Sequence, residues 1–243
     1  MKKLLIALLS FGLLSACASK KEDFSTLSAE DIYTKAYHYT TDTKYEKAAE
    51  YFEKVETEHP YSKWAVKSKL MAAYAYYKAA KYDDALLALD RFIKYHPGNK
   101  DIAYAYYLRA ICYYDQIAPA TKSQGVTEQA EGALNDVITL FPDTDYAKDA
   151  SNKLKLVLEH EAAHEMNIGR FYLKNKNYLS ALNRFDTVVQ KYQTTVHIEE
   201  ALYREVEIYK LIGLDNNAVR IADVLNFNYP ESNWNKKALK ILK

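Results

Sequence analysis

The sequence predicts an all-α fold made of repeated helix pairs, and three observations support this prediction. Gly and Pro together number only 11 (6 + 5) among 243 residues, so tight turns are too few for a sandwich, a barrel or a propeller. Hydrophobic residues make up 49% of the chain, which is enough for a sizeable core and argues against disorder. Four of the five prolines end segments of similar pattern, which indicates a repeat.

The charge balance excludes one class of partner. The chain has 33 basic and 32 acidic residues, and neither an acidic tail nor a polybasic arm stands out in the sequence. A nucleic-acid-binding protein needs a basic patch or stripe. We therefore expect no nucleic acid among the partners.

The first element is an N-terminal segment, residues 1–17, that reads MKKLLIALLSFGLLSAC. Two lysines precede an apolar stretch of about thirteen residues, which suits a signal peptide and falls short of the roughly 20 residues of a membrane-spanning helix. Residues 14–17, Leu-Ser-Ala-Cys, resemble the lipobox of bacterial lipoproteins. The resemblance implies a signal peptide over residues 1–16 and a lipidated N-terminus at Cys17, and Ala18 resembles the outer-membrane sorting pattern. An ordinary secretory signal with a chance cysteine is the alternative.

A polar tether and one further cysteine follow. Residues 17–28 comprise the lipidated cysteine and a segment without apolar periodicity, which we expect to link the anchor to the folded part. With Cys17 acylated, Cys112 has no partner for an intramolecular disulfide. Cys112 lies in an apolar run, where a buried small hydrophobic residue is the simplest interpretation and a reactive thiol the alternative.

Five repeats occupy the rest of the chain, and proline marks most of their ends. The terminal positions are separated by 37, 45, 51 and 37 residues, and they are Pro60, Pro97, Pro142, Gln193 and Pro230. Two positions after each stands a residue suited to N-capping the next helix; these residues are Ser62, Asn99, Thr144, Thr195 and Ser232. A period of this size is typical of solenoids built from helix pairs.

Small residues precede an aromatic residue by three positions in the first helix of the first four pairs. The small residues are Ala36, Ala73, Ala110 and Gly169, and the aromatic ones are Tyr39, Tyr76, Tyr113 and Tyr172. This spacing lets two antiparallel helices approach closely. With Tyr-x-x-Ala early in the second helix and Pro after it, the pattern resembles the tetratricopeptide repeat (TPR). The resemblance implies a right-handed superhelical solenoid of five TPR-like helix pairs, with a generic helical bundle as the alternative.

The two long intervals predict two departures from regularity. The third repeat has 8 extra residues (45 − 37), which we place in a loop near residues 117–127 because Pro119 and Gly125 lie there. The fourth has 14 (51 − 37) between Asp145 and Gly169, without an intervening Gly or Pro, so its first helix is predicted to be elongated. This helix would join an N-terminal half of three repeats (29–142) to a C-terminal half (143–243). Residues 233–243 are expected to form a capping helix.

Residues 160–164 match the motif H-E-x-x-H, in which two histidines bind zinc and the glutamate acts as a base. Three observations weaken the match: an acidic residue follows directly, no histidine stands at the third-ligand position of the metzincins, and repeat phasing turns both histidines from the partner helix. We interpret His160, Glu161 and His164 as a solvated polar face, with a zinc metalloprotease as the minor alternative. We expect no catalytic residue, no metal site and no cofactor.

The order of a lipobox, a short tether, five TPR-like units and a loop in the third resembles the BamD (ComL) family of outer-membrane assembly lipoproteins. The most specific stretches are residues 74–78, 89–93, 107–109, 141–147, 169–173 and 183–184. The resemblance implies a non-catalytic scaffold of the β-barrel assembly machinery, lipid-anchored to the outer membrane and facing the periplasm. The implied partners are the POTRA region of a BamA-like subunit, other assembly lipoproteins and unfolded outer-membrane proteins. Another lipidated periplasmic TPR scaffold, serving cell division or pilus assembly, is the alternative.

Two surfaces for these partners can be placed on the sequence. Asn183 and Arg184 match the Asn-Arg pair of the family, whose Arg is implicated in contacting a carboxylate of the BamA-like partner. An ion pair within the repeat is the alternative. First helices mostly line the groove of TPR proteins, and the predicted groove residues are Tyr74, Tyr77, Tyr107, Arg109 and Tyr114. Such aromatic walls suit an extended apolar-aromatic segment, such as the end of an unfolded barrel strand; packing between repeats is the alternative.

Overall fold

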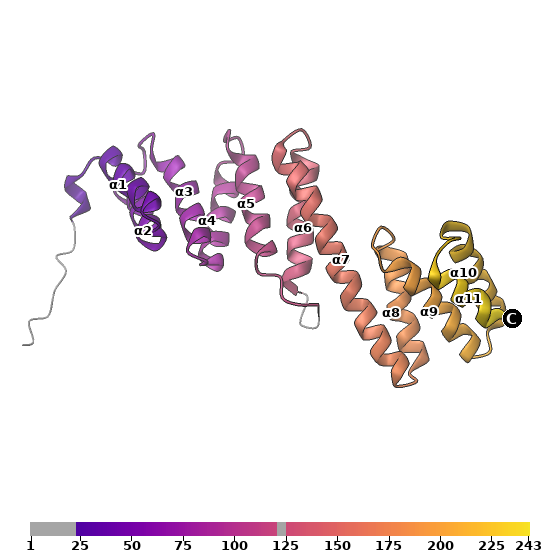
Figure 1. Cartoon of the computed structure of the whole chain (residues 1–243). Helices are drawn as coiled ribbons and strands as arrows, with labels where there is room; N and C mark the ends of the chain where they lie inside the picture. Colours follow the sequence, from indigo (N-terminus) through magenta and orange to yellow (C-terminus); the bar gives the residue numbers. More distant parts are fainter. Residues whose placement is uncertain (1–22, 121–124) are drawn as a thin grey trace, which may run out of the picture.

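The structure is a computed structural model that describes residues 23–120 and 125–243. These residues form eleven α-helices and one short 3-10 helix, with no strand among them, which confirms the predicted all-α fold. The elements are η1 (Phe24–Thr26), α1 (Ala29–Thr41), α2 (Tyr45–Glu58), α3 (Ala65–Lys78), α4 (Tyr82–Tyr95), α5 (Ile102–Tyr114), α6 (Gly125–Leu140), α7 (Asp145–Lys174), α8 (Tyr178–Lys191), α9 (Ile198–Leu211), α10 (Asp215–Asn228) and α11 (Asn233–Leu242). They follow one another along an elongated solenoid (Figure 1). The predicted signal peptide and Cys17 lie outside the described residues.

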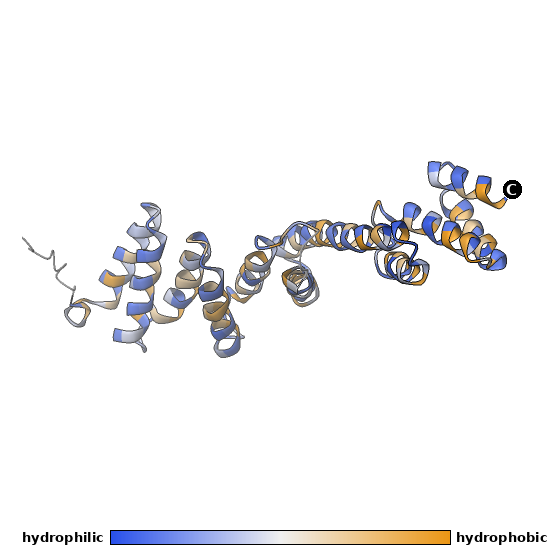
Figure 2. Ribbon diagram, turned by 90° about the horizontal axis from the view of Figure 1, so that it is seen from below, coloured by the Kyte–Doolittle hydropathy of each residue, from blue (hydrophilic) through white to orange (hydrophobic). Residues whose placement is uncertain are grey.

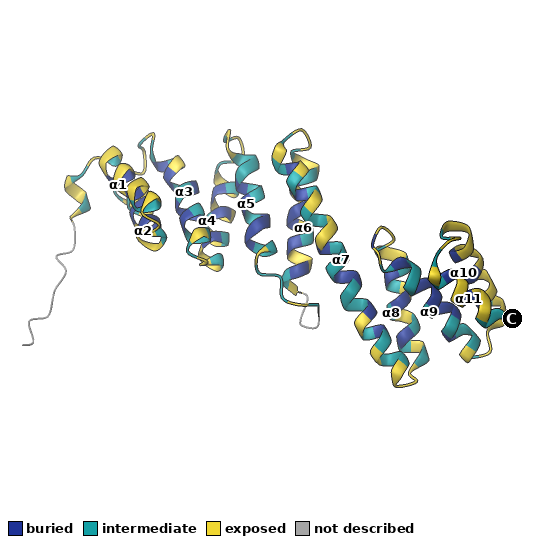
Figure 3. Ribbon diagram, in the orientation of Figure 1, coloured by how far each residue is buried: buried dark blue, intermediate teal, exposed yellow. Residues whose placement is uncertain are grey.

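Successive helices form five pairs, in which the odd-numbered helix comes first, and α11 caps the last pair. Hydrophilic and hydrophobic positions alternate along most ribbons in Figure 2, as amphipathic helices require. The buried positions face neighbouring helices in Figure 3. The core is therefore a row of small clusters, each shared by one pair and its neighbours, as expected for a solenoid.

Within each pair, a small residue of one helix shares a core cluster or a close contact with a large residue of the other. These combinations are Ala36 with Phe52, Ala73 with Leu89, Ala110 with Leu134, Gly169 with Phe185 and, with the sizes reversed, Ala222 with Val206. The approach is closest in the fourth pair, where a Cβ added to Gly169 would lie 2.6 Å from Cε1 of Phe185. Phe185 is fully buried, so its ring has little room to move aside. The small positions predicted from the sequence therefore do allow close helix packing.

The predicted N-caps are correct at two of the five repeat ends. The side chains of Thr144 and Ser232 accept hydrogen bonds from the backbone N–H groups of Ala147 and Trp234, so α7 and α11 begin directly after them. The other three are wrong, because α3, α5 and α9 begin two residues later, at residues 65, 102 and 198. At these ends a backbone carbonyl closes a turn onto the first helical residue; the carbonyls belong to Ser62, Asn99 and Thr195.

The elongated first helix of the fourth repeat is α7, which has 30 residues where α3 and α9 have 14. Of the 16 additional residues (30 − 14), 14 come from the longer repeat and two from the direct capping by Thr144. The first half of α7 packs against α5 and α6 through Ala150 and Val157. Its second half packs against α8 through Ala162 and Met166. One helix thus belongs to two cores, and the division of the chain at residue 142 stays a prediction.

The loop of the third repeat ends earlier than predicted. Helix α5 ends at Tyr114 and α6 begins at Gly125, so residues 125–127 are helical and Thr127 is buried. Gly125 begins a helix instead of interrupting one, which the composition of the segment did not reveal.

Cys112 is a buried residue of α5, which confirms the simplest interpretation of this position. Its side chain is 0% exposed and packs in the core cluster of the second pair beside Leu108 and Ala105. Burial raises the pKa of the Cys112 thiol to about 12. The thiol is therefore protonated at neutral pH and behaves as a small hydrophobic group.

Candidate partner-binding surfaces

Two of the predicted groove tyrosines bridge neighbouring first helices. The hydroxyl of Tyr77 on α3 donates to Oδ2 of Asp115, just past α5, at 2.8 Å. The hydroxyl of Tyr107 on α5 donates to Oδ2 of Asp149 on α7 at 2.7 Å. Burial raises the pKa of both tyrosines, and the accepting carboxylates raise it further. Both hydroxyls are therefore protonated donors at neutral pH, and they connect α3, α5 and α7.

Further side chains extend this arrangement along α5 and α7. The ring of Tyr146 lies 5.1 Å, centroid to centroid, from the ring of Tyr107. The amine of Lys153 lies 5.2 Å from the centroid of the Tyr114 ring and 3.3 Å from the carboxylate of Asp149. These contacts fix the Tyr107 and Tyr114 rings, which lie about two turns apart on the same side of α5.

We call the tyrosines and their acceptors the aromatic ladder; its members are Tyr74, Tyr77, Tyr107, Tyr114, Asp115 and Asp149. Tyr74 and Tyr77 both pack against the core cluster of the second pair, and all four tyrosines are half-buried. The structure therefore brings four of the five predicted groove residues together. Because the rings are partly buried, they also pack between helices. Packing between repeats, the alternative to a groove, is therefore part of their role.

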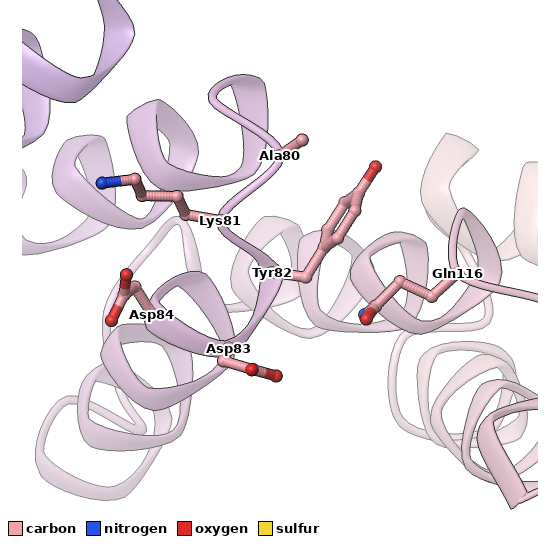
Figure 4. A pocket seen from close by; sticks show the side chains of 6 residues that line it. All are labelled: Ala80, Lys81, Tyr82, Asp83, Asp84 and Gln116. Atoms are coloured by element: carbon pink, nitrogen blue, oxygen red, sulfur yellow. The ribbon is translucent and has the colours of Figure 1, made fainter.

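A hollow of about 320 Å³ adjoins the aromatic ladder where α3 ends and α4 begins; its lining residues are Ala80, Lys81, Tyr82, Asp83, Asp84 and Gln116. Figure 4 shows Tyr82 and Gln116 on two neighbouring elements that border this hollow. The ring of Tyr82 lies 6.2 Å from that of Tyr77. The hollow therefore continues the aromatic surface past the C-terminal ends of α3 and α5.

Arg109 does not join the aromatic ladder, which departs from the predicted groove. It stands two residues after Tyr107 and so about 200° further around α5. Its Nη1 lies 3.4 Å from Asp90 on α4, and its Nη2 lies 2.8 Å from Asp136 on α6. The two carboxylates line a second hollow, of about 270 Å³, together with Arg109. Arg109 therefore ties three helices together on the side of α5 that faces the second helices.

Asn183 and Arg184 lie on α8, away from the aromatic ladder. Asn183 is exposed. Nη1 of Arg184 lies 3.2 Å and 3.1 Å from the two carboxylate oxygens of Glu165 on α7. The ion pair within the repeat that was the alternative for Arg184 is thus present. The side chain of Arg184 is nevertheless 42% exposed, so part of the guanidinium faces the surroundings of the protein.

Ion pairs join the first helices α7 and α9, in the region that follows the aromatic ladder. Arg170 on α7 binds both carboxylate oxygens of Glu200 on α9, at 2.6 Å from Nη2 and 3.0 Å from Nε. Arg204 lies 3.2 Å from Glu200 and 2.8 Å from Glu207. Burial opposes the charge of Glu200, but the two arginines more than offset this effect and lower its pKa. We call these four residues the arginine network.

The H-E-x-x-H segment is not a solvated face, which corrects the sequence interpretation. Glu161 is only 5% exposed, and burial together with the carboxylate of Glu131 on α6 raises its pKa to about 7. Nδ1 of His164 pairs with the backbone carbonyl of Ala120. Across residues 23–120 and 125–243, no group of three or more His, Cys, Asp or Glu side chains is placed to hold a metal ion. The geometry therefore gives no support to a zinc protease.

Sequence reasoning missed the carboxylates that organise the first-helix faces. Asp115, Asp149 and Glu200 stand 38, 42 and 30 residues after their partners. None of these separations is a helical spacing, but each is close to one repeat. A comparison of residues one repeat apart would therefore have found the acceptors.

Comparison with known proteins finds relatives along the whole chain. Residues 25–224 match the model of a family described as outer membrane lipoprotein (YfiO). The chain is 45% identical over 243 residues to the outer membrane protein assembly factor BamD of Rickettsia prowazekii, covering 99% of this chain and 97% of the relative. The protein of the same name from Caulobacter vibrioides is 46% identical over 80% of this chain and 64% of its own length. The one from Neisseria meningitidis is 30% identical over 98% of this chain and 95% of its own length. Within the described residues, no helix is both long and apolar enough to cross a membrane.

Proposed function

This chain belongs to the family of outer membrane lipoproteins that includes the BamD assembly factors, and from this premise we propose that it is a lipid-anchored scaffold for the assembly of outer-membrane β-barrel proteins. The observation that carries the proposal is the identity of 45% over 99% of the chain with a BamD protein. The aligned part spans every helix pair, so the likeness covers the whole solenoid.

The membrane attachment would come from the N-terminal segment. Acyl chains on Cys17 would bind the outer membrane, because each buried methylene contributes about 0.8 kcal/mol and two or more chains give stable anchoring. The lipobox at residues 14–17 and the family description support this attachment. The solenoid would then work in the periplasm, at the surface of the membrane.

The aromatic ladder is the proposed surface for unfolded outer-membrane proteins. Half-buried rings offer apolar contact area at little cost in side-chain entropy, because their hydrogen bonds to Asp115 and Asp149 already hold them in place. The exposed parts of the rings and the hollow beside Tyr82 suit an extended segment with alternate apolar side chains. Recognition would be sequence-tolerant, because ring contacts discriminate little among large apolar residues.

The exposed side of Asn183 and Arg184 is the proposed contact for the POTRA region of a BamA-like subunit, and other assembly lipoproteins would bind elsewhere on the solenoid. Glu165 uses only Nη1 of the guanidinium. A partner carboxylate can therefore approach the exposed part of Arg184 without breaking the ion pair within the repeat. Such a second carboxylate would find a guanidinium already oriented, which favours binding.

Affinity capture from detergent-solubilised membranes tests this contact. We expect Arg184→Ala to lose the BamA-like subunit, because the variant removes the donor of the proposed contact. Glu165→Gln is the matched control, because it removes the same ion pair within the repeat but keeps the guanidinium. Equal loss of the subunit from both variants would assign a purely structural role to Arg184. Retention by both would contradict the proposed partner surface, and circular dichroism checks that both variants are helical.

A further inference from the structure

Aromatic side chains project from the two turns that connect the first three pairs. Tyr61, in the turn between α2 and α3, is 100% exposed, and Tyr95, at the start of the turn between α4 and α5, is 65% exposed. Trp64 is half-buried beside Tyr61. Figure 1 shows both turns along the same edge of the solenoid. Exposed aromatic residues in neighbouring turns need an explanation, because the core of the protein does not use them.

Lysines accompany these aromatic residues. Residues 58–67 and 94–101 contain four lysines and two acidic residues, which gives a net charge of +2 (4 − 2). The lysines are exposed and are Lys63, Lys67, Lys94 and Lys100. In the next turn, between α6 and α7, the balance reverses, because Asp143 and Asp145 accompany one lysine that is already paired at 2.7 Å. The basic character therefore ends after the second turn.

We define the turn edge by six residues of these two turns and of the adjoining end of α4: Tyr61, Lys63, Trp64, Lys94, Tyr95 and Lys100. The chain enters the fold close to it. The backbone carbonyl of Leu27 lies 2.8 Å from Nε2 of His59, at the start of the first turn. Phe24 packs on Tyr51 with ring centroids 4.9 Å apart, and Tyr51 lies about 12 Å below that turn along α2. Asp23 stands six positions after Cys17, and an extended chain of six residues spans about 20 Å.

We propose that the turn edge rests on the anionic phospholipid surface of the membrane that holds the acyl chains of Cys17. This inference relies on the lipid anchor of the proposed function. Tyrosine and tryptophan side chains favour the boundary between lipid headgroups and acyl chains, and lysines are attracted to anionic headgroups. The tether is long enough to let the turn edge reach the surface and too short to let the first pairs diffuse far from it.

This contact would fix the orientation of the N-terminal pairs. The hollow at Tyr82 lies beside the turn between α3 and α4, which is at the other end of these helices from the turn edge. With the turn edge on the membrane, the hollow and the adjoining end of the aromatic ladder would face away from the lipid. An unfolded protein arriving through the periplasm would meet them first.

The two tryptophans of the chain allow a direct test. Trp64 lies in the turn edge, whereas Trp234 lies in α11 at the far end of the solenoid. Both are half-buried, both stack on a tyrosine, with centroids 4.5 Å from Tyr33 and 5.2 Å from Tyr203, and both carry a lysine amine near the ring. They therefore form a matched pair of fluorescent probes in one molecule.

The experiment uses the full-length acylated protein on vesicles that contain phosphatidylglycerol and brominated lipids, which quench tryptophan fluorescence on contact. We expect quenching to be several-fold stronger in Trp234→Phe, which reports Trp64, than in Trp64→Phe, which reports Trp234. Adding Lys63→Glu and Lys100→Glu to Trp234→Phe should weaken the quenching, as should vesicles of phosphatidylcholine alone. Circular dichroism of each variant checks that it is folded.

Three outcomes would overturn the inference. Equal quenching of both probes would mean that no particular face meets the lipid. Protein that sediments with the vesicles but shows no quenching of Trp64 would keep the anchor and reject the turn edge, leaving that edge for a protein partner. Failure of the wild-type protein to sediment with vesicles would reject the anchor of the proposed function, and the turn edge with it.

Discussion

The first helices of the two ends of the solenoid are joined by different chemistry. Among α3, α5 and α7, tyrosine hydroxyls donate to the carboxylates of Asp115 and Asp149. Between α7 and α9, Arg170 and Arg204 share the carboxylate of Glu200. The same architectural contact, one repeat to the next, is thus made by neutral aromatic donors in one region and by ion pairs in the other. The fold therefore tolerates either chemistry at this contact.

The comparison also predicts unequal energetic roles. A tyrosine whose hydroxyl bond is lost still fills its place with the ring, so the aromatic ladder should lose little stability. An arginine network that loses its central carboxylate retains positive charges in partly buried positions. The region of α7 to α9 should therefore depend on its polar contacts more strongly than the region of α3 to α7.

Glu200→Gln should have the largest effect. We expect a loss of about 2–3 kcal/mol in the free energy of unfolding, somewhat below the value for breaking a fully buried ion pair, because the arginines are partly exposed. Asp149→Asn is the matched variant in the aromatic ladder and should cost about 1 kcal/mol, because its amide oxygen can still accept from Tyr107. Urea unfolding followed by circular dichroism measures both. Equal losses would remove the distinction between the two regions.

The pH dependence of stability should also arise near α9. Burial and the nearby Asp186 raise the pKa of Glu205 to about 8, and Glu205 is only 2% exposed. Because the folded state holds this proton more tightly than the unfolded state, stability decreases as the pH rises from about 5 to about 8. Glu205→Gln mimics the protonated acid. It should leave stability nearly unchanged at pH 5 and increase it at pH 8, where the wild-type protein has lost most of the contribution of the bound proton.

Unfolding measurements at pH 5 and pH 8 provide the control within one experiment. The wild-type protein and Glu205→Gln should have similar midpoints at the lower pH and diverge at the higher one. A constant difference at both values would mean that the substitution acts through packing. A matching change in Asp149→Asn would mean that the pH dependence is not confined to the region of α9.

The smallest expected effect concerns binding. Tyr77→Ala with Tyr107→Ala should weaken binding of a C-terminal peptide of an outer-membrane protein by about tenfold, because two aromatic contact surfaces are lost. Tyr77→Phe with Tyr107→Phe is the control, because it keeps the rings and removes only the hydroxyl bonds. Fluorescence anisotropy with a labelled peptide measures both, and helicity should change little. Unchanged affinity in the alanine variant would contradict the ladder as a peptide surface.

Local patterns in the sequence were sufficient for the repeats and for most helices. Proline, small residues and apolar spacing located every helix pair, because each of these signals acts within about one helical turn or one repeat. The failures at Ser62, Asn99 and Thr195 have a common reason. The free N–H groups at the start of a helix can be satisfied by a capping side chain or by a backbone carbonyl, so residue type alone does not locate the first helical residue.

The candidate surfaces were harder to predict, because they depend on which way each side chain points from its helix and on contacts between residues far apart in the sequence. Arg109 was grouped with Tyr107 through proximity in sequence, although two residues along an α-helix point to nearly opposite sides. A pairing of α7 with α8 alone predicts a solvated face at Glu161. The long helix also packs against α6, whose Glu131 meets Glu161. A helix that serves two cores has more than one buried side.

The length of α7 has a geometric consequence. Each residue of an α-helix advances the chain by about 1.5 Å and turns it by about 100°. The length of the uninterrupted helix α7 therefore sets both the distance and the rotation between the aromatic ladder and the arginine network. One residue added between Val157 and Ala162 would barely change their separation but would swing one surface about a quarter turn around the other. The angle between the two surfaces therefore changes only in whole steps, one for each residue in α7.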